Sequence, residues 1–431
     1  MKTALIITFY LFLTLLFGLV ACKQGDMTSS SVGTKTAGEV EGSPFHGTWQ
    51  GVLGKPLDFR ITMDCFAQND VEKVLLSITS EELAIYYLPV DFRTDSGTLL
   101  IWFNDEGNRA EVSFQFDQDG PLTGTYKQYG RSASGTFTKI SDTPTDGEFH
   151  VKTPEHLIDF LRESNNFNRA DAGDIVFEYD YTHPRLIELR NKYGFETIAG
   201  TGDTQSKAIK LLNWLSSGTH HKGDYDSQRE KNALALLEYT FNQGPENGLN
   251  CYNLSVLLSE IYLSVGIQAR VLSLFPKNPD DTDNHVVVMA WMPEKGKWIM
   301  LDPSFNAYFR DPEGNILSPA ELRNKIASNE TIKLNSDSKR DYDDYISYLA
   351  KDMFYFVSSR KTGFGTFSGS PELIYLCPVD FDLVDWRVKN TRYRGSVNNT
   401  EEEVMVRSEE NIRQMKYVYA TAESFWGNIA N

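Results

Sequence analysis

The sequence has few cysteines, too little positive charge to balance its acidic residues, and only one long apolar run. No pair of its four Cys or seven His residues has the close spacing of a zinc site. The 42 Lys and Arg residues stand against 59 Asp and Glu residues. The resulting formal net charge of −17 argues against a nucleic-acid partner, whose phosphates need a basic surface. Beyond residue 21, no apolar run is long enough to span a membrane.

The overall composition is that of a globular protein of several domains. Hydrophobic residues make up 41% of the chain and aromatic residues 13%, which excludes an intrinsically disordered chain. The 431 residues predict two or three domains.

The first residues have the pattern of a secretory signal. Lys2 is followed by an almost wholly apolar run over residues 4–20, and the small residue Ala21 precedes Cys22. The run Leu-Val-Ala-Cys resembles the bacterial lipoprotein box, which implies a signal peptide over 1–21 and lipidation of Cys22. The resemblance, with Lys23 after the Cys, implies a lipoprotein of the outer membrane, on its periplasmic or cell-surface face. The alternative is a signal anchor that stays in the membrane.

A tether and an all-β domain follow. Residues 22–43 are rich in Gly, Ser, Thr, Lys and Glu, so we expect a flexible tether. Residues 44–141 hold short alternating apolar runs separated by turn residues, which predict antiparallel strands. The runs Gly-Thr-Trp-Gln-Gly at residue 47 and Gly-Thr-Tyr-Lys-Gln at residue 124 nearly repeat. We therefore expect the first and last strands to pair and close a small barrel or sandwich.

The remaining chain has the order of an α+β domain. After a linker over 141–149, apolar residues at helical spacing predict helices near Leu157, Leu189 and Leu211, and strands follow residue 266. We place this domain at 150–338. An aromatic-rich C-terminal extension occupies 339–431, where the rings either pack on the domain or form a wall for a sugar or peptide.

Cys251 begins a predicted buried helix. Apolar residues recur at 3.6-residue spacing from Leu254 to Val265, and Gly266 supplies the left-handed cap. The unpaired N–H groups and the positive dipole end at this helix start favour a thiolate and could hold an oxyanion.

His285 and Asp302 flank a predicted hairpin. If Trp291 pairs with Gly296, His285 lies opposite Asp302; if the loop is one pair tighter or looser, the two are diagonal on the same face. Either register lets the carboxylate reach the imidazole. A register shift by a single residue would place the two side chains on opposite faces of the hairpin.

Several of these motifs together resemble the transglutaminase-like superfamily. They are Gly-Leu-Asn-Cys ending at Cys251, the helix ending at Gly266, the His285 strand with Trp291, and Leu-Asp-Pro at 301–303. The resemblance covers roughly residues 200–325 and implies a papain-like α+β core. It also implies that Cys251 is the nucleophile, His285 the general base and acid, and Asp302 the orienting carboxylate.

Other candidates for the site have equally ordinary explanations. Asn250 could donate to an oxyanion or simply cap the helix, and Trp214 could cover the thiolate or belong to the core. His220 and His221 are interpreted as a polar turn near the cleft. The acidic run at 280–283 is interpreted as a solvated loop, with a cationic ligand or calcium as alternatives.

The sequence thus predicts a lipid-anchored cysteine enzyme. It would act on a peptide, protein or peptidoglycan-type amide through a thioester, with hydrolysis favoured over acyl transfer and with no metal or cofactor. The rival hypothesis is a non-catalytic lipoprotein that binds a glycan or peptide and keeps a vestigial triad. Of the other cysteines, Cys65 and Cys377 are predicted to be buried thiols rather than a disulfide.

Overall fold

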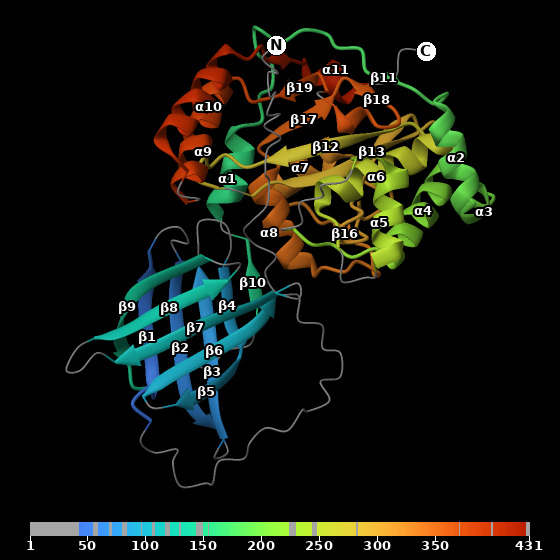
Figure 1. Ribbon diagram of the computed structural model, residues 1–431. Coiled ribbons are helices and arrows are strands. Elements are labelled where there is room, and N and C mark those ends of the chain that lie inside the picture. The colour runs from blue at the N-terminus through green and yellow to red at the C-terminus, as the bar shows by residue number, and fades with distance from the viewer. Residues whose placement is uncertain are drawn as a thin grey trace, which may run out of the picture. The chain divides into compact units, whose positions relative to one another are not determined.

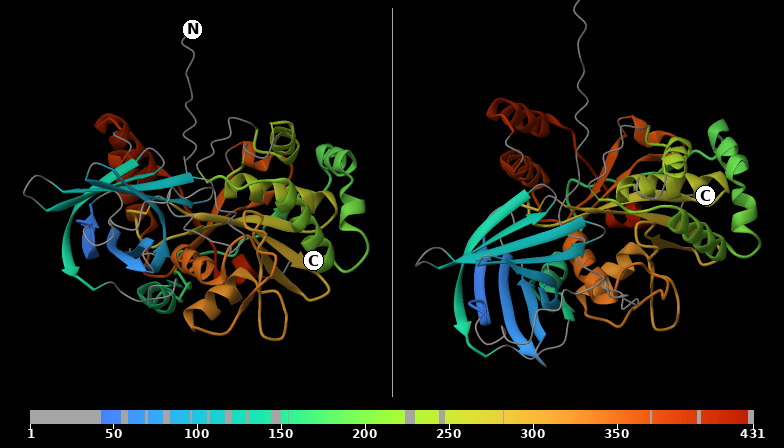
Figure 2. Two further views of the ribbon diagram at one scale, coloured as in Figure 1. Left: turned by 90° about the horizontal axis from the view of Figure 1, so that it is seen from below. Right: turned by 60° about the horizontal axis from the view of Figure 1, so that its bottom comes forward.

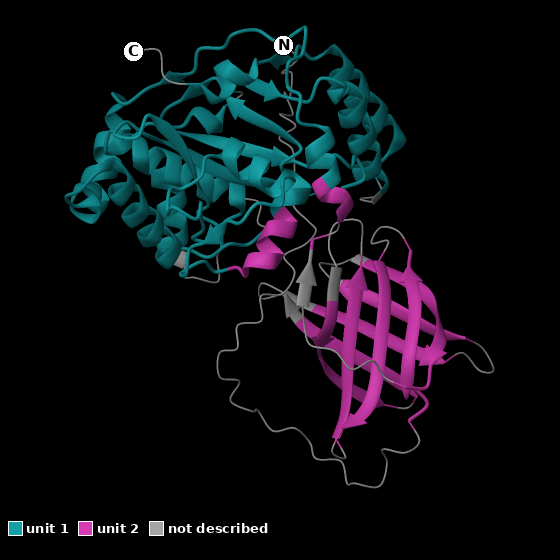
Figure 3. Cartoon of the chain, turned by 180° about the vertical axis from the view of Figure 1, so that it is seen from behind, with its two compact units in different colours: residues 1–17, 159–339, 349–431 teal, residues 18–158, 340–348 magenta. Residues whose placement is uncertain are grey.

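Most of the chain after residue 42 has a described structure. The computed structural model describes residues 43–54, 59–68, 71–79, 84–95, 97–105, 108–116, 121–128, 131–143, 150–153, 155–223, 230–243, 248–281, 283–369, 371–397 and 400–427. The predicted signal peptide and Cys22 lie outside these residues. The described residues divide into two compact units: 43–158 with 340–348, and 159–339 with 349–431 (Figure 3). Within the described part of the chain, no helix is both long and apolar enough to cross a membrane.

The first unit is a nearly closed antiparallel sheet, seen in blue and cyan in Figure 1. Its strand order is β10-β4-β3-β2-β1-β9-β8-β7-β6-β5. The strands are β1 (Gly47–Leu53), β2 (Phe59–Gln68), β3 (Val71–Thr79), β4 (Ala84–Pro89), β5 (Asp91–Asp95), β6 (Thr98–Asp105), β7 (Asn108–Phe116), β8 (Leu122–Gln128), β9 (Arg131–Ser141) and β10 (His150–Lys152). The expected all-β domain is therefore present.

The first and last strands of this region pair, as the sequence predicted, but the repeat did not identify the last strand. β1 pairs with β9 in antiparallel fashion, whereas the second Gly-Thr-aromatic run lies in β8. Gly124 in β8 has a packing role, because a Cβ there would lie 2.5 Å from the Phe137 ring and 2.9 Å from Phe114. Those two rings meet edge to face at 4.9 Å in the core of the barrel.

The second unit combines helices with a six-stranded sheet of order β14-β13-β12-β17-β19-β20. Its strands are β11 (Glu178–Tyr179), β12 (Ala269–Phe275), β13 (His285–Met292), β14 (Lys297–Leu301), β15 (Phe309–Arg310), β16 (Lys333–Leu334), β17 (Tyr355–Ser359), β18 (Lys361–Thr362), β19 (Leu373–Leu376) and β20 (Val418–Tyr419). Its helices are α2 (Pro184–Tyr193), α3 (Phe195–Ala199), α4 (Thr204–Gly218), α5 (Ala233–Gln243), α6 (Cys251–Ser264), α7 (Pro319–Ala327), η1 (Thr366–Ser368), α9 (Leu383–Val397), α10 (Glu402–Gln414) and α11 (Ala422–Trp426). Two helices, α1 (Glu155–Glu163) and α8 (Tyr342–Asp352), are divided between the units.

Helix α6 is the centre of this unit. All of its residues from Asn253 to Ser264 are buried, because α2, α4 and α5 surround it and β12 and β13 lie along it. Figures 1 and 2 show the green helices gathered around this yellow-green one. Gly266 ends the helix with φ 79°, the left-handed conformation that the sequence predicted. Helices before Cys251 and strands after Gly266 confirm the α+β order.

The hairpin of β13 and β14 has the diagonal arrangement, the second of the arrangements considered. Met292 pairs with Lys297 and Trp291 with Trp298, so the ladder is shifted by one pair relative to a Trp291–Gly296 pairing. His285 and Asp302 are therefore diagonal on one face rather than directly opposite.

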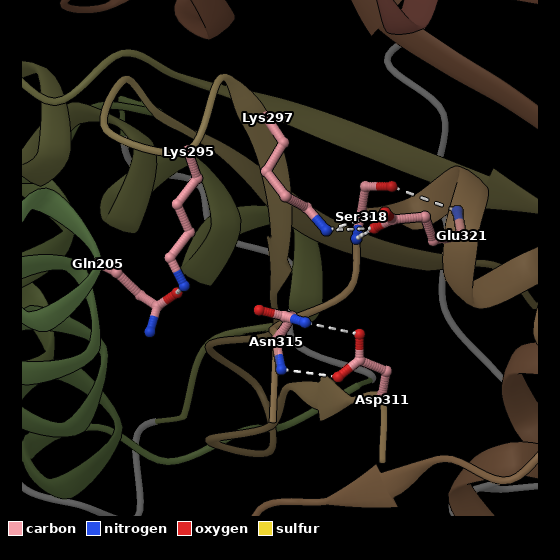
Figure 4. Close-up of polar contacts among 7 residues, drawn as sticks. All are labelled: Gln205, Lys295, Lys297, Asp311, Asn315, Ser318 and Glu321. Atoms are coloured by element: carbon pink, nitrogen blue, oxygen red, sulfur yellow. Dashed lines mark hydrogen bonds and ion pairs between the residues drawn. The ribbon is translucent and has the colours of Figure 1, made fainter. Parts of the chain in front are cut away.

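Polar contacts fix the turn end of this hairpin to helices. Lys297 Nζ contacts both carboxylate oxygens of Glu321, at 2.8 and 2.7 Å, while Ser318 and Glu321 form the capping box of α7 (Figure 4). In the turn, Lys295 donates to Gln205 of α4 at 2.9 Å. These contacts hold β14, the strand that leads to Asp302, against two helices.

Most aromatic residues of the C-terminal extension pack into the core, the first of the two interpretations considered. Tyr355 stacks on Phe275 at 4.8 Å, and Trp386 meets the same ring edge to face. Cys377 is buried in this cluster and Cys65 is buried in the barrel. Both are free thiols, as predicted, and burial raises the pKa of each.

Candidate functional site

Cys251 is the first residue of α6, at the position the sequence predicted. Asn250 is the N-cap, and its Oδ1 accepts the N–H of Asn253 at 2.9 Å. The backbone before the helix is held by His220 and Lys222, which exchange hydrogen bonds of 2.8 and 2.9 Å with Leu249. The cap and this short pairing fix where the sulfur lies.

His285 and Asp302 form a buried pair. The His285 Nε2 atom lies 2.6 Å from Asp302 Oδ2, and the two side chains are 1% and 0% exposed. The second oxygen of Asp302 accepts the N–H of Ser304 at 2.8 Å. The Phe305 ring stacks on the imidazole at 5.5 Å, so the loop after Asp302 places the histidine as well as the carboxylate.

That loop is itself tightly held. Asp302 and Ala307 exchange backbone hydrogen bonds of 2.9 and 3.0 Å. Asn306 adopts a left-handed φ of 53° and donates to the Asp337 carboxylate at 3.1 Å, so it helps to fix the loop. The Lys339 ammonium donates to the carbonyl of Ser216, and burial lowers its pKa.

The surroundings of the thiol oppose its ionisation in the resting protein. Burial raises the pKa of the Cys251 thiol, and the charges of Asp283 and Asp302 raise it further. Backbone N–H groups of Val286 and Tyr252 hydrogen-bond to the sulfur and act in the opposite direction. The amides near the helix start thus favour the thiolate, as the sequence predicted, but burial and the two carboxylates outweigh them.

These interactions gather the three predicted catalytic residues. The sulfur contacts the N–H of Val286, the residue after His285, and the charge of Asp302 raises the pKa of the thiol. Ser255, one turn along α6, donates to the Val286 carbonyl at 2.9 Å and locks the helix to β13. The start of α6 therefore places the Cys251 thiol beside the start of β13, where the His285 imidazole is paired with the Asp302 carboxylate.

The weaker candidates are placed as follows. Trp214 belongs to an aromatic cluster, 5.0 Å from Phe195 and 5.8 Å from Phe241, so its described ring contacts are those of a core residue. Asn250 caps α6, and its role toward an oxyanion stays a prediction. His221 is more than a surface turn, because its ring meets Phe305 edge to face at 5.1 Å.

The acidic run at 280–283 is not simply a solvated loop. Asp281 and Asp283 form ion pairs of 3.0 and 3.2 Å with Lys351, whose side chain is 3% exposed. Within the described residues, no group of His, Cys, Asp and Glu has an arrangement that could hold a metal ion. Sequence reasoning missed Lys351, which is 68 residues away from Asp283 and carries no motif.

A separate hollow lies in the C-terminal part of the unit. It has a volume of about 560 Å³, and its lining includes Tyr417, Tyr419, Arg169 and Asp171. The Arg169 guanidinium lies 4.2 Å from the centre of the Tyr419 ring. None of the three predicted catalytic residues lines it.

Comparison with known proteins identifies the domain around this site. Residues 191–303 match the family model of the transglutaminase-like superfamily. Residues 191–303 are a transglutaminase-like domain. The match spans the elements from α3 to β14 and ends one residue after Asp302.

Two solved structures give low similarity scores. One is a "putative cysteine protease" from Cytophaga hutchinsonii, with 11% identity, a TM-score of 0.23, and coverage of 67% of this chain and 86% of that one. The other is a "putative protease" from Parabacteroides distasonis, with 12% identity, a TM-score of 0.18, and coverage of 55% and 41%. A search of curated proteins found no match. The assignment of the transglutaminase-like domain therefore rests on the family model.

Proposed function

We propose that this protein is a cysteine enzyme that attacks an amide carbonyl with Cys251 and passes through a thioester. The observation that carries the proposal is the 2.6 Å contact between His285 Nε2 and Asp302 Oδ2, beside a thiol at the start of α6. A nucleophile, a base and a group that orients the base are the three parts that acyl transfer requires.

The proposed reaction begins from a neutral thiol. Asp302 accepts at Nε2, so Nδ1 is the ring nitrogen that takes the thiol proton as the sulfur–carbon bond forms. His285 then gives this proton to the leaving amine, and the carbon–nitrogen bond breaks to leave a thioester on Cys251. Because burial and two carboxylates raise the thiol pKa, the thiolate is made by His285 at the moment of attack rather than stored.

Water completes the proposed cycle. His285 removes a proton from water, the hydroxide attacks the thioester carbonyl, and the thiol leaves with the proton that His285 returns. A carboxylic acid and free Cys251 result, so the net reaction is hydrolysis of the amide. Transfer would need an amine that binds in place of water; hydrolysis is therefore the default outcome.

A trapped acyl-enzyme would test this proposal without knowledge of the natural substrate. We expect p-nitrophenyl acetate to acetylate Cys251, seen by peptide mass spectrometry after acid quench. Hydroxylamine should remove the acetyl group, as it does from thioesters. Cys65→Ala and Cys377→Ala serve as matched controls, because both thiols are buried outside the site. Acetylation that persists at another residue in Cys251→Ala, with none at Cys251 in the wild type, would contradict the proposal.

The sequence also supports lipid anchoring at Cys22. We propose that the mature protein is tethered to a membrane by acyl chains on this residue, in the outer membrane according to the lipoprotein resemblance. Metabolic labelling with a fatty-acid analogue should mark the protein in its native host, and Cys22→Ser should abolish the label. Labelling of that variant would exclude Cys22 as the acylated residue.

The hollow around Tyr417 and Tyr419 supports a second candidate function, the binding of a glycan or peptide without catalysis. Half-buried aromatic side chains together with polar ones in one concavity are typical of such sites. Absence of an acyl-enzyme, together with binding that Tyr417→Ala weakens and Cys251→Ala leaves intact, would favour this candidate over the enzyme.

A further inference from the structure

A buried ion cluster lies beside the strand that carries His285. Lys351 Nζ is 3.0 Å from Asp281, 3.2 Å from Asp283 and 3.4 Å from Asp352. The side chains of Lys351 and Asp281 are each 3% exposed and that of Asp352 is 0% exposed, so water screens these charges weakly. One cation thus faces three carboxyl groups.

The carboxyl groups of this cluster are not equivalent. Burial raises the pKa of Asp352 well above its ordinary value, and the charges of Asp283 and Asp281 raise it further, while Lys351 opposes this only in part. Burial thus disfavours the charged form of Asp352. The shortest contacts of Lys351 are those with Asp281 and Asp283.

The segment that carries these two aspartates is fixed in place. The N–H of Asp283 donates to the Asp281 carboxylate at 2.8 Å. Asn390 of α9 donates to the carbonyls of Pro279 and Asp281 at 2.8 and 2.6 Å. Two residues after Asp283 the chain enters β13 at His285, so a shift of this segment would move the histidine.

Asp283 also acts on the nucleophile. Its charge is one of the two that oppose ionisation of Cys251, the other being that of Asp302. The Asp302 charge is engaged by His285, whereas the Asp283 charge is engaged by Lys351. Each carboxylate near the sulfur therefore contacts a basic group, and Asp283 shares Lys351 with Asp281 and Asp352.

We propose that Lys351 and Asp283 form an ion pair that belongs to the catalytic site, in which Lys351 is a positioning residue that sets the charge beside Cys251 and holds the entry to β13. The inference rests on the proposed function of Cys251 as nucleophile. Lys351 lies beyond residue 303, where the family match ends. The pair would make the reactivity of Cys251 depend on a residue outside the matched domain.

Removing a negative or a positive charge should shift the pH profile of Cys251 alkylation in opposite directions. We expect Asp283→Asn to move the pH profile of iodoacetamide alkylation at Cys251 to lower pH, because a negative charge near the sulfur is removed. Lys351→Met should move the profile to higher pH, by roughly 0.5 to 1 unit, because two carboxylates lose their cation. Lys351→Arg should restore the wild-type profile, since it keeps the charge.

Controls separate this effect from general damage. Lys389→Met removes one positive charge from an exposed ion pair with Asp385 and should leave the profile unchanged. The Asp283→Asn and Lys351→Met double variant should shift less than Lys351→Met alone, because the charge that Lys351 balances beside the sulfur is gone. Thermal unfolding of each variant verifies that it is folded. A folded Asp283→Asn variant with an unshifted profile would overturn the inference, even if Lys351→Met fails to fold.

The readouts distinguish failure of this inference from failure of the proposed function. Alkylation reports the thiol alone and needs no turnover. If the profiles shift as expected but no acyl-enzyme forms, the ion pair stands and the catalytic proposal fails. If an acyl-enzyme forms and neither variant shifts the profile, the catalytic proposal stands and Lys351 has only a structural role.

Discussion

His285 Nε2 and Asp302 Oδ2 lie 2.6 Å apart, and neither side chain is open to solvent. Their strands pair so that the two residues are diagonal neighbours on one face of the hairpin, and the contact spans only 17 residues of sequence. A buried carboxylate in this position selects the tautomer of the imidazole and stabilises the imidazolium that forms during proton transfer.

Asp302→Asn should nearly abolish acyl transfer while leaving the fold intact. The amide keeps the shape of the carboxylate but cannot stabilise the imidazolium, and it favours the wrong tautomer. We expect the acylation rate with p-nitrophenyl acetate to fall by about 10²- to 10⁴-fold. Asp311→Asn, in an exposed loop, is the matched control. A loss smaller than about tenfold in a folded protein would show that Asp302 does not orient the base.

Alkylation of Cys251 should be slow at neutral pH and rise steeply only in alkaline solution. Burial, Asp283 and Asp302 raise the thiol pKa, so less thiolate is present than the free-Cys value of about 8.5 would give. His285→Ala should reduce acylation by the ester much more than it reduces alkylation at high pH, where hydroxide has already made the thiolate. Fast alkylation near neutral pH, lost in His285→Ala, would instead reveal a stored thiolate–imidazolium pair.

Glu260 should make the stability of the second unit decrease as pH rises. Burial raises the pKa of this carboxyl from 4.5 to about 8, although the N–H groups of Ala233 and Gly365 donate to it. The folded protein keeps the proton over this range whereas the unfolded chain releases it. The stabilisation is therefore complete below about pH 4.5 and is lost progressively up to about pH 8, with an upper bound on the order of 5 kcal/mol.

Glu260→Gln isolates this contribution. The amide cannot ionise, and it offers one acceptor to two N–H donors, so we expect a loss of about 1 kcal/mol at acidic pH. The difference in thermal midpoint between wild type and variant should shrink or reverse toward pH 8, because only in the wild type does the unfolded chain gain stability by releasing a proton that the folded protein keeps. A difference that stays constant with pH would mean that folding does not raise the pKa of Glu260.

Arg270→Met should loosen the C-terminal segment. The buried guanidinium lies 3.7 Å from the centre of the Phe177 ring and 5.2 Å from that of Phe425, and it donates to the Phe425 carbonyl. Without this donor, the amides of residues 422–427 should exchange hydrogen for deuterium faster than in the wild type. Arg270→Lys tests whether the charge alone suffices. Unchanged exchange in a folded Arg270→Met variant would contradict this role.

Local signals in the sequence predicted the local parts of the site. Asn250 before Cys251 and glycine at 266 bounded the helix correctly, because caps and left-handed residues have few alternatives. The hairpin fixed His285 and Asp302 on one face, since strand parity survives a shift of a whole pair. The sequence did not predict which residue of β14 pairs with Trp291, because the turn residues did not determine where the pairing of the two strands begins.

Such local signals could not predict contacts between segments that are far apart in the sequence. Nothing near residue 283 indicates a lysine at 351, and the acidic run looks like an ordinary solvated loop until that partner is known. The repeat starting at Gly124 pointed to the wrong last strand, because β8 and β9 both have the alternation of a barrel strand. Pairing between strands is decided by the whole core, which a local pattern does not contain.

The strand order β12-β17 has a practical consequence for anyone who prepares a shortened protein. β17 follows β12 by some eighty residues of chain and lies beyond residue 338, yet it hydrogen-bonds directly to it. A fragment cut after residue 303 or 338 would leave β12 as an open edge whose residues are mostly buried in the full chain. Such an edge invites pairing with other molecules, so we expect these fragments to aggregate rather than behave as a minimal enzyme.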